Sequence, residues 1–275
     1  MTAHRITVFA LLTALLGLAL PAMASDILKE RRWAEQISDG LLVGEAVNLT
    51  AGKDSFLALY TPAGGNERRG GVLLLHGLGA HPDWPDVIAP LRQELPDAGW
   101  ATLSLQLPIL PNDAKFEEYL PLFPAADARI SAGIRYLQQQ GVTTIALVGH
   151  SLGAAMGAHF LADKAAGSEM VHAFVGIGMN SHPGSVAHTP DALAKISLPV
   201  LDLYGAQDLL GVLASAKARA RAAQQANNSA YRQVEIPGAD HFFRHLDDTL
   251  VKRVASWLTH TAAEASSAAS TSTIP

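Results

Sequence analysis

The stretch Gly149-His150-Ser151-Leu152-Gly153 lies between an apolar run at residues 144–148 and a run of small and apolar residues at 154–161. The first run predicts a short buried strand and the second predicts a helix. A Gly-x-Ser-x-Gly pattern at such a turn is typical of the sharp elbow that lifts a serine hydroxyl above a sheet. Glycine removes the collisions that side chains two residues before and after the serine would cause. The pattern predicts Ser151 as a nucleophile, although a glycine-rich turn that merely contains a serine would look the same.

Two polar residues follow later predicted strands in the order that such a serine requires. Asp208 comes after the predicted strand at residues 198–204, and His241 comes after the predicted strand at residues 231–236. Because ligands and reactive groups gather at the carboxyl ends of parallel strands, we expect both side chains to lie near Ser151. We expect His241 to be the general base and acid, and Asp208 to be the carboxylate that orients its imidazole.

Other assignments of these residues stay open at this point. Asp208 would also suit the N-cap of the following helix. Asp202 is a rival acid, although its place inside an apolar strand favours a structural role. His241 and His245 lie four residues apart and could hold a metal on one face of a helix, but the sequence offers no third ligand. We therefore expect no metal and no cofactor.

A second glycine-rich turn, His76-Gly77-Leu78-Gly79, follows the predicted strand at residues 71–75. Acyl transfer needs N–H donors aimed at the oxygen of the tetrahedral intermediate. We expect the backbone N–H of Leu152, just after the nucleophile, and the backbone N–H of Leu78 to form this oxyanion hole. The alternative is a glycine-rich loop without a catalytic role.

Strand-like and helix-like runs alternate along the rest of the chain. Two early strands at residues 43–50 and 55–60 are predicted to form an antiparallel edge. Further strands are predicted at residues 100–105 and 173–179, and helices at residues 83–95, 125–140, 212–226 and 243–258. This order predicts an α/β fold with a mostly parallel central sheet and helices on both faces. Residues 179–191 are too few for a large lid, whereas residues 107–123 either line an acyl pocket or cover the core.

With these motifs in place, residues 41–260 resemble the α/β-hydrolase superfamily. The segments His76-Gly77-Leu78-Gly79-Ala80-His81-Pro82-Asp83-Trp84 and Leu103-Ser104-Leu105-Gln106-Leu107-Pro108 resemble an exported bacterial branch of unassigned function. The resemblance implies the α/β-hydrolase fold, a triad of Ser151, Asp208 and His241, and His76 as a support of the oxyanion loop. It implies no substrate.

The composition of the two termini predicts that the chain consists of a signal peptide, one domain and a tail. A short basic start, an apolar stretch at residues 6–20 and Pro21-Ala22-Met23-Ala24 are typical of a signal peptide at residues 1–24, with an uncleaved anchor as the alternative. We expect a hydrolase domain at residues 25–260 and a disordered Ala/Ser/Thr tail at residues 261–275. The expected location is the periplasm or the medium.

Charge and cysteine content exclude several function classes. The chain has no cysteine, which excludes disulfides, thiolate metal sites and a cysteine nucleophile. Its net charge of −5 comes without a basic stripe, so we expect no nucleic acid partner. The predicted protein is a monomeric, exported serine hydrolase without a stable membrane span, cleaving small or moderately sized carboxylic esters. An acyltransferase or thioesterase on the same triad and a non-catalytic, hydrolase-like envelope binding protein are the alternatives.

Overall fold

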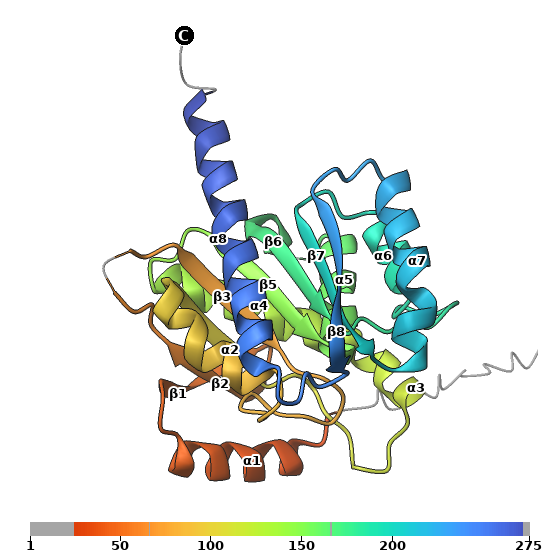
Figure 1. The fold of residues 1–275 in the computed structure, drawn as a ribbon. Helices are drawn as coiled ribbons and strands as arrows, with labels where there is room; N and C mark the ends of the chain where they lie inside the picture. The colour runs from red at the N-terminus through yellow and green to blue at the C-terminus, as the bar shows by residue number, and fades with distance from the viewer. Residues whose placement is uncertain (1–24, 66, 166, 272–275) are drawn as a thin grey trace, which may run out of the picture.

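The computed structural model describes residues 25–65, 67–165 and 167–271, and its centre is an eight-stranded sheet (Figure 1). The strand order is β1-β2-β4-β3-β5-β6-β7-β8. β2 is antiparallel to both β1 and β4, and all other neighbours are parallel. The strands are β1 (Glu45–Ala51), β2 (Asp54–Thr61), β3 (Gly70–Leu75), β4 (Trp100–Leu105), β5 (Ile145–His150), β6 (Val171–Ile177), β7 (Val200–Gln207) and β8 (Tyr231–Asp240). The predicted parallel sheet with an antiparallel edge is confirmed. The predicted signal peptide lies outside the described residues.

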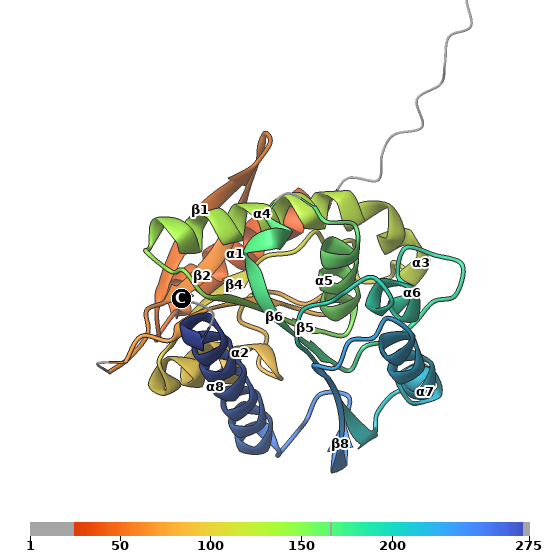
Figure 2. The same cartoon turned by 90° about the horizontal axis from the view of Figure 1, so that it is seen from above.

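Helices cover both faces of this sheet (Figure 2). α4 and α5 pack on one face, while α2 and α8 pack on the other. The helices are α1 (Ile27–Gly40), α2 (Ile88–Glu94), α3 (Phe116–Tyr119), α4 (Phe123–Gln139), α5 (Leu152–Ala162), α6 (Thr189–Leu193), α7 (Leu210–Gln225) and α8 (Asp247–Thr271). Along β3, Leu73 and Leu75 enter the first core while Val72 and Leu74 enter the second. Apolar side chains on both faces of one strand explain why this strand reads as a continuous apolar run.

α2 and α1 are among the helices that differ from the expectation. The helix predicted at residues 83–95 begins only at Ile88, because Trp84 precedes a proline and the backbone of Val87 has a φ of 64°. α1 was not predicted at all. It begins after Asp26, whose side chain caps the helix by accepting a hydrogen bond from the backbone N–H of Lys29 at 3.0 Å.

Much of the segment at residues 261–275, which was expected to be a disordered tail, is helical in the structure. α8 continues through Thr271, well into the segment that the composition marked as unstructured. Its first half is fixed by the buried side chains of Leu250, Val254 and Leu258. Alanine, which has the highest helix propensity, recurs in the sequence that follows and favours continuation of the helix beyond the packed turns. Residues 272–275 lie outside the described residues.

The segment between β6 and β7 holds only the short helix α6, so the prediction of no large lid is confirmed. Within residues 25–65, 67–165 and 167–271, no helix is both long enough and apolar enough to cross a membrane.

Candidate active site

Ser151 occupies a strained turn between β5 and α5. Its backbone angles are φ 54° and ψ −117°, a conformation that costs free energy for a residue with a side chain. The glycines around it are required by contact. A Cβ on Gly149 would lie 2.6 Å from Cα of Ala154, and a Cβ on Gly153 would lie 2.4 Å from the carbonyl oxygen of His76. The elbow that the sequence pattern predicts is therefore present.

The pairing of β7 with β8 places Asp208 beside His241. After an irregularity at Gly205, the two strands pair again through Gln207 and Asp240. Asp208 and His241 are the residues that directly follow these two strands, so both side chains lie at the same edge of the sheet. A Cβ on Gly205 would lie 2.2 Å from the carbonyl oxygen of Ala239, so the close approach needs glycine there.

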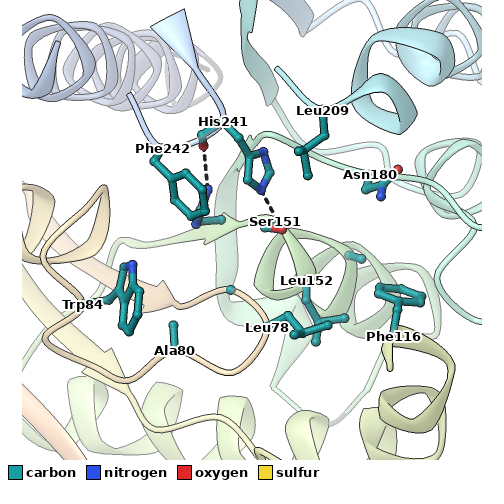
Figure 3. A pocket seen from close by; sticks show the side chains of 13 residues that line it. Leu78, Ala80, Trp84, Phe116, Ser151, Leu152, Asn180, Leu209, His241 and Phe242 are labelled. Atoms are coloured by element: carbon teal, nitrogen blue, oxygen red, sulfur yellow. Dashed lines mark hydrogen bonds between the residues drawn. The ribbon is translucent and has the colours of Figure 1, made fainter. Parts of the chain in front are cut away.

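The three predicted side chains form a hydrogen-bonded chain, of which Figure 3 shows the contact between His241 and Ser151. Nδ1 of His241 lies 2.6 Å from Oδ1 of Asp208, and Nε2 lies 3.0 Å from Oγ of Ser151. Because the carboxylate can only accept, Nδ1 carries the proton and Nε2 is free to accept the serine hydroxyl. Asp208 also accepts backbone N–H groups from Leu209 at 2.7 Å and Gly205 at 3.3 Å. Leu209, and not Asp208, occupies the N-cap of α7.

Asp202, the rival acid, belongs to a separate network. Its side chain is fully buried and accepts hydrogen bonds from Arg219, from the hydroxyl of Tyr231 at 2.6 Å and from the amide of Gln233 at 2.8 Å. None of these bonds reaches His241. The structure therefore gives Asp202 a place in the core.

The glycine-rich loop after β3 is supported by the side chain of His76. Leu78 and Leu152 both line the pocket next to Ser151, and Leu152 is the first residue of α5, where an N–H has no acceptor within the helix. His76 is buried, donates from Nδ1 to the carbonyl of Gly77 at 2.8 Å and accepts the N–H of Leu107 at Nε2 at 2.9 Å. Burial lowers the pKa of His76 to about 3, so this imidazole is neutral and links the loop after β3 to the segment after β4.

The pocket around Ser151 has a volume of about 340 Å³ and an uncharged lining. Its residues are Gly77, Leu78, Ala80, Trp84, Phe116, His150, Ser151, Leu152, Ala155, Asn180, Leu209, His241 and Phe242. Figure 3 shows Trp84 and Phe242 on one side of Ser151, with Leu78, Leu152 and Phe116 on the other. An apolar wall with few polar groups is typical of a small-molecule site.

The segment at residues 107–123 mostly covers the core. Leu107, Ile109, Leu110, Leu122 and Phe123 are buried, and Phe116 alone of this segment lines the pocket. The ring of Phe116 stacks on His182, with centroids 3.5 Å apart and planes 11° from parallel. This stacked pair joins α3 to the loop after β6, and Phe116 presents its side chain to the site.

Some residues of the site gave little or no signal in the sequence. A Cβ on Gly178 would lie 3.0 Å from Nδ1 of His241, and this glycine has a φ of 57°. Leu209 and Phe242 line the pocket because they directly follow Asp208 and His241 in the chain. For the metal alternative, both nitrogens of His241 are already engaged. Among the residues that the structure describes, no group of three His, Cys, Asp or Glu side chains could hold a metal ion.

Solved structures with the same architecture are esterases and related hydrolases. Est1E from Butyrivibrio proteoclasticus aligns with a TM-score of 0.62 at 18% identity, over 79% of this chain and 99% of its own. The dienelactone hydrolase from Anabaena variabilis aligns with a TM-score of 0.59 at 24% identity, over 78% of this chain and 96% of its own. A serine hydrolase without a lid from Xanthomonas campestris aligns with a TM-score of 0.60 at 14% identity, over 81% and 94%.

The chain therefore has the α/β-hydrolase fold. It belongs to the family described as "Protein of unknown function (DUF3530)", whose model matches residues 21–120 and 124–260. No curated protein matches the chain in sequence.

Proposed function

We propose that the protein is a serine hydrolase that cleaves carboxylic esters through an acyl-enzyme. The observation that carries the proposal is the chain of contacts from Ser151 Oγ through His241 to Asp208, at 3.0 and 2.6 Å. These distances lie within the reach expected of a nucleophile, its base and the group that orients the base. The fold likeness to esterases supports the same class of chemistry.

The reaction begins when Oγ of Ser151 attacks the ester carbonyl while Nε2 of His241 takes the hydroxyl proton. The negative charge on the carbonyl oxygen is stabilised by the backbone N–H groups of Leu78 and Leu152. The C–O bond of the ester then breaks, and His241 returns the proton to the departing alcohol. A water molecule repeats the sequence on the acyl-enzyme, releasing the acid and restoring Ser151. Asp208 stabilises the imidazolium that forms in both halves.

The lining of the pocket favours neutral esters. None of its thirteen residues is Asp, Glu, Lys or Arg, so a charged acyl group would lose its hydration without finding a counter-charge. The small volume and the absence of a large lid favour small or moderately sized esters over bulk lipid. We place the reaction outside the cytoplasm, after removal of residues 1–24, because of the signal-like composition of that segment.

Acyl transfer and thioester cleavage use the same groups and differ in the second nucleophile or the leaving group. A non-catalytic binding protein would keep the fold and the pocket without turnover. These alternatives are separated by two measurements on the mature protein.

The first measurement is labelling by a fluorophosphonate. We expect Ser151 to be modified in the wild type and the Ser151→Ala variant to stay unlabelled. A folded wild type that remains unlabelled would contradict the hydrolase proposal.

The second measurement is a panel of p-nitrophenyl esters, assayed with and without EDTA. Turnover that EDTA does not change supports the serine mechanism, whereas loss with EDTA would point to a metal at His241 and His245. Turnover of no ester in the panel would favour the binding protein. Addition of a thioester and of an alcohol acceptor tests the two catalytic alternatives.

A further inference from the structure

His150 is a buried imidazole that the proposed reaction leaves unused. It is the last residue of β5 and immediately precedes Ser151. Its Nε2 lies 2.9 Å from the backbone carbonyl oxygen of His241, and the two imidazole rings are 4.8 Å apart. Since a carbonyl can only accept, Nε2 of His150 carries the proton. Burial, more than any other cause, lowers the pKa of His150 to about 4, so the ring is neutral near pH 7.

Among the described residues, His150 is the one hydrogen-bond donor to the carbonyl of His241. This carbonyl lies beyond the end of β8 and before the start of α8, in an irregular turn where Phe243 and His245 have φ values of 53° and 64°. In the described part of the chain, no backbone N–H bonds to this carbonyl. The peptide group between His241 and Phe242 is therefore held on both sides: its carbonyl accepts from His150, and its N–H, on Phe242, donates to Oδ1 of Asp240 at 3.0 Å. The buried carbonyl left without the donor of His150 would cost free energy.

The elbow thus holds both partners of the proton transfer. Ser151 presents its hydroxyl to the ring of His241, and the residue before it holds the backbone of the same histidine. Asp208 fixes the other side of the ring through Nδ1. His241 is thereby restrained at three points, two of which are independent of Asp208.

We infer that His150 is a positioning residue, whose neutral imidazole holds the carbonyl of His241 so that the ring of His241 faces Ser151. The inference rests on the proposed function, because it concerns the base of that reaction. A purely structural alternative is that His150 only fills space against the rings of His241 and Phe242, the latter 5.9 Å away.

Three substitutions separate hydrogen bonding from packing. In His150→Gln, the amide nitrogen can reach the place of Nε2 and donate to the carbonyl. In the matched variant His150→Asn, the same amide is one methylene too short. In His150→Phe, a ring of similar size remains but no donor. The kcat and KM for p-nitrophenyl butyrate, thermal unfolding, and the low-field proton resonance of the His241 Nδ1–H are measured for each.

We expect His150→Phe and His150→Asn to lose about 100-fold in kcat with little change in KM, the scale of a misplacement of about 1 Å. We expect His150→Gln to recover most of the activity and to keep the low-field resonance. The inference is overturned if His150→Phe retains the wild-type kcat, or if the Gln variant loses as much as the Phe variant. If His150→Phe does not fold, the comparison of Gln with Asn carries the same test.

The resonance also separates this inference from the proposed function. A wild type that turns over no ester would contradict the proposed hydrolase. The Nδ1–H resonance would still report whether His241 keeps its place beside Asp208. Its persistence in the Phe variant would overturn the role of His150 even then.

Discussion

Asp202 and Arg219 face each other inside the domain through two hydrogen bonds, of 2.8 and 3.2 Å, and neither side chain reaches solvent. The guanidinium also donates to the carbonyl of Met179 at 2.7 Å, next to the pocket residue Asn180. The pair therefore connects β7 and α7 to the loop that borders the site. Of the two acids in this region, Asp202 therefore supports the fold through Arg219, whereas Asp208 is the one that contacts His241.

The first prediction concerns Asp202→Asn. Removal of the carboxylate leaves the charge of Arg219 buried without compensation, which costs about 3–5 kcal/mol of stability. For a domain of this size the loss corresponds to a fall in Tm of roughly 10 °C. Calorimetry measures it, and we expect the kcat per folded molecule to change little. An unchanged Tm together with a large loss of kcat would make Asp202 the catalytic acid.

The second prediction concerns Asp208→Asn, the matched substitution at the proposed triad. An amide can donate to Nδ1 of His241, which places the imidazole proton on Nε2, where it can no longer accept from Ser151. Loss of a triad aspartate by this route costs ~10⁴ in kcat in a serine protease. We expect a fall of that order in steady-state turnover, with a far-UV spectrum that stays native. A kcat within a few-fold of the wild type would remove Asp208 from the mechanism.

The third prediction concerns the length of the acyl chain. The site is small, and its lining includes Phe116, whose ring stacks on His182. Each buried methylene contributes ~0.8 kcal/mol, so kcat/KM should rise with chain length and stop rising at about eight carbons. We expect Phe116→Ala to move this limit to longer chains, as measured with a series of p-nitrophenyl esters. A wild-type rate that keeps rising, or that jumps at a lipid interface, would show that the pocket opens further.

The fourth prediction concerns pH and Asp127, which lies on α4. Its Oδ1 is buried without a hydrogen-bond partner, and burial together with nearby Asp163 raises its pKa to about 7. Between the ordinary carboxyl pKa and pH 7, the folded state binds the extra proton, so stability falls as the pH rises through this window. We expect Asp127→Asn to raise the Tm at pH 8 and to change it little well below the ordinary carboxyl pKa, where the aspartate is protonated in both states. A Tm gain that is the same at both pH values would contradict this account.

The sequence predicts local structure best at positions where the backbone geometry restricts which type of residue can occur. Gly149, Ser151 and Gly153 mark the elbow because each position excludes or strains other residues, and these constraints are local. Asp208 and His241 were found from their order after predicted strands. The pairing of Gln207 with Asp240, which brings them to one level, depends on a register shift that no local pattern records.

Other features depend on tertiary contacts. α1 carries many charged residues, and its buried side chains are those of Lys29 and Glu30, so it is fixed through polar contacts far along the chain. Lys29, for example, donates to the carbonyl of Leu110 at 2.9 Å. The role of Phe116 was equally hidden, because its apolar neighbours enter the core while it alone lines the pocket. The bond from His150 to His241 joins residues 91 positions apart, so the sequence pattern alone could not predict it.

The position of Ser25 and Asp26 affects how the protein can be attached to a tag or a support. Ser25 and Asp26 are bonded to Ile109, in the segment that leaves β4 at the rim of the sheet where the pocket lies. In Figure 1, α1 lies at the opposite end of the molecule from the far end of α8. A tag or support joined directly before Ser25 would lie next to the segment after β4, whereas one joined beyond α8 would lie at the opposite end of the molecule. The C-terminal end is thus the better point for attaching the protein to a support.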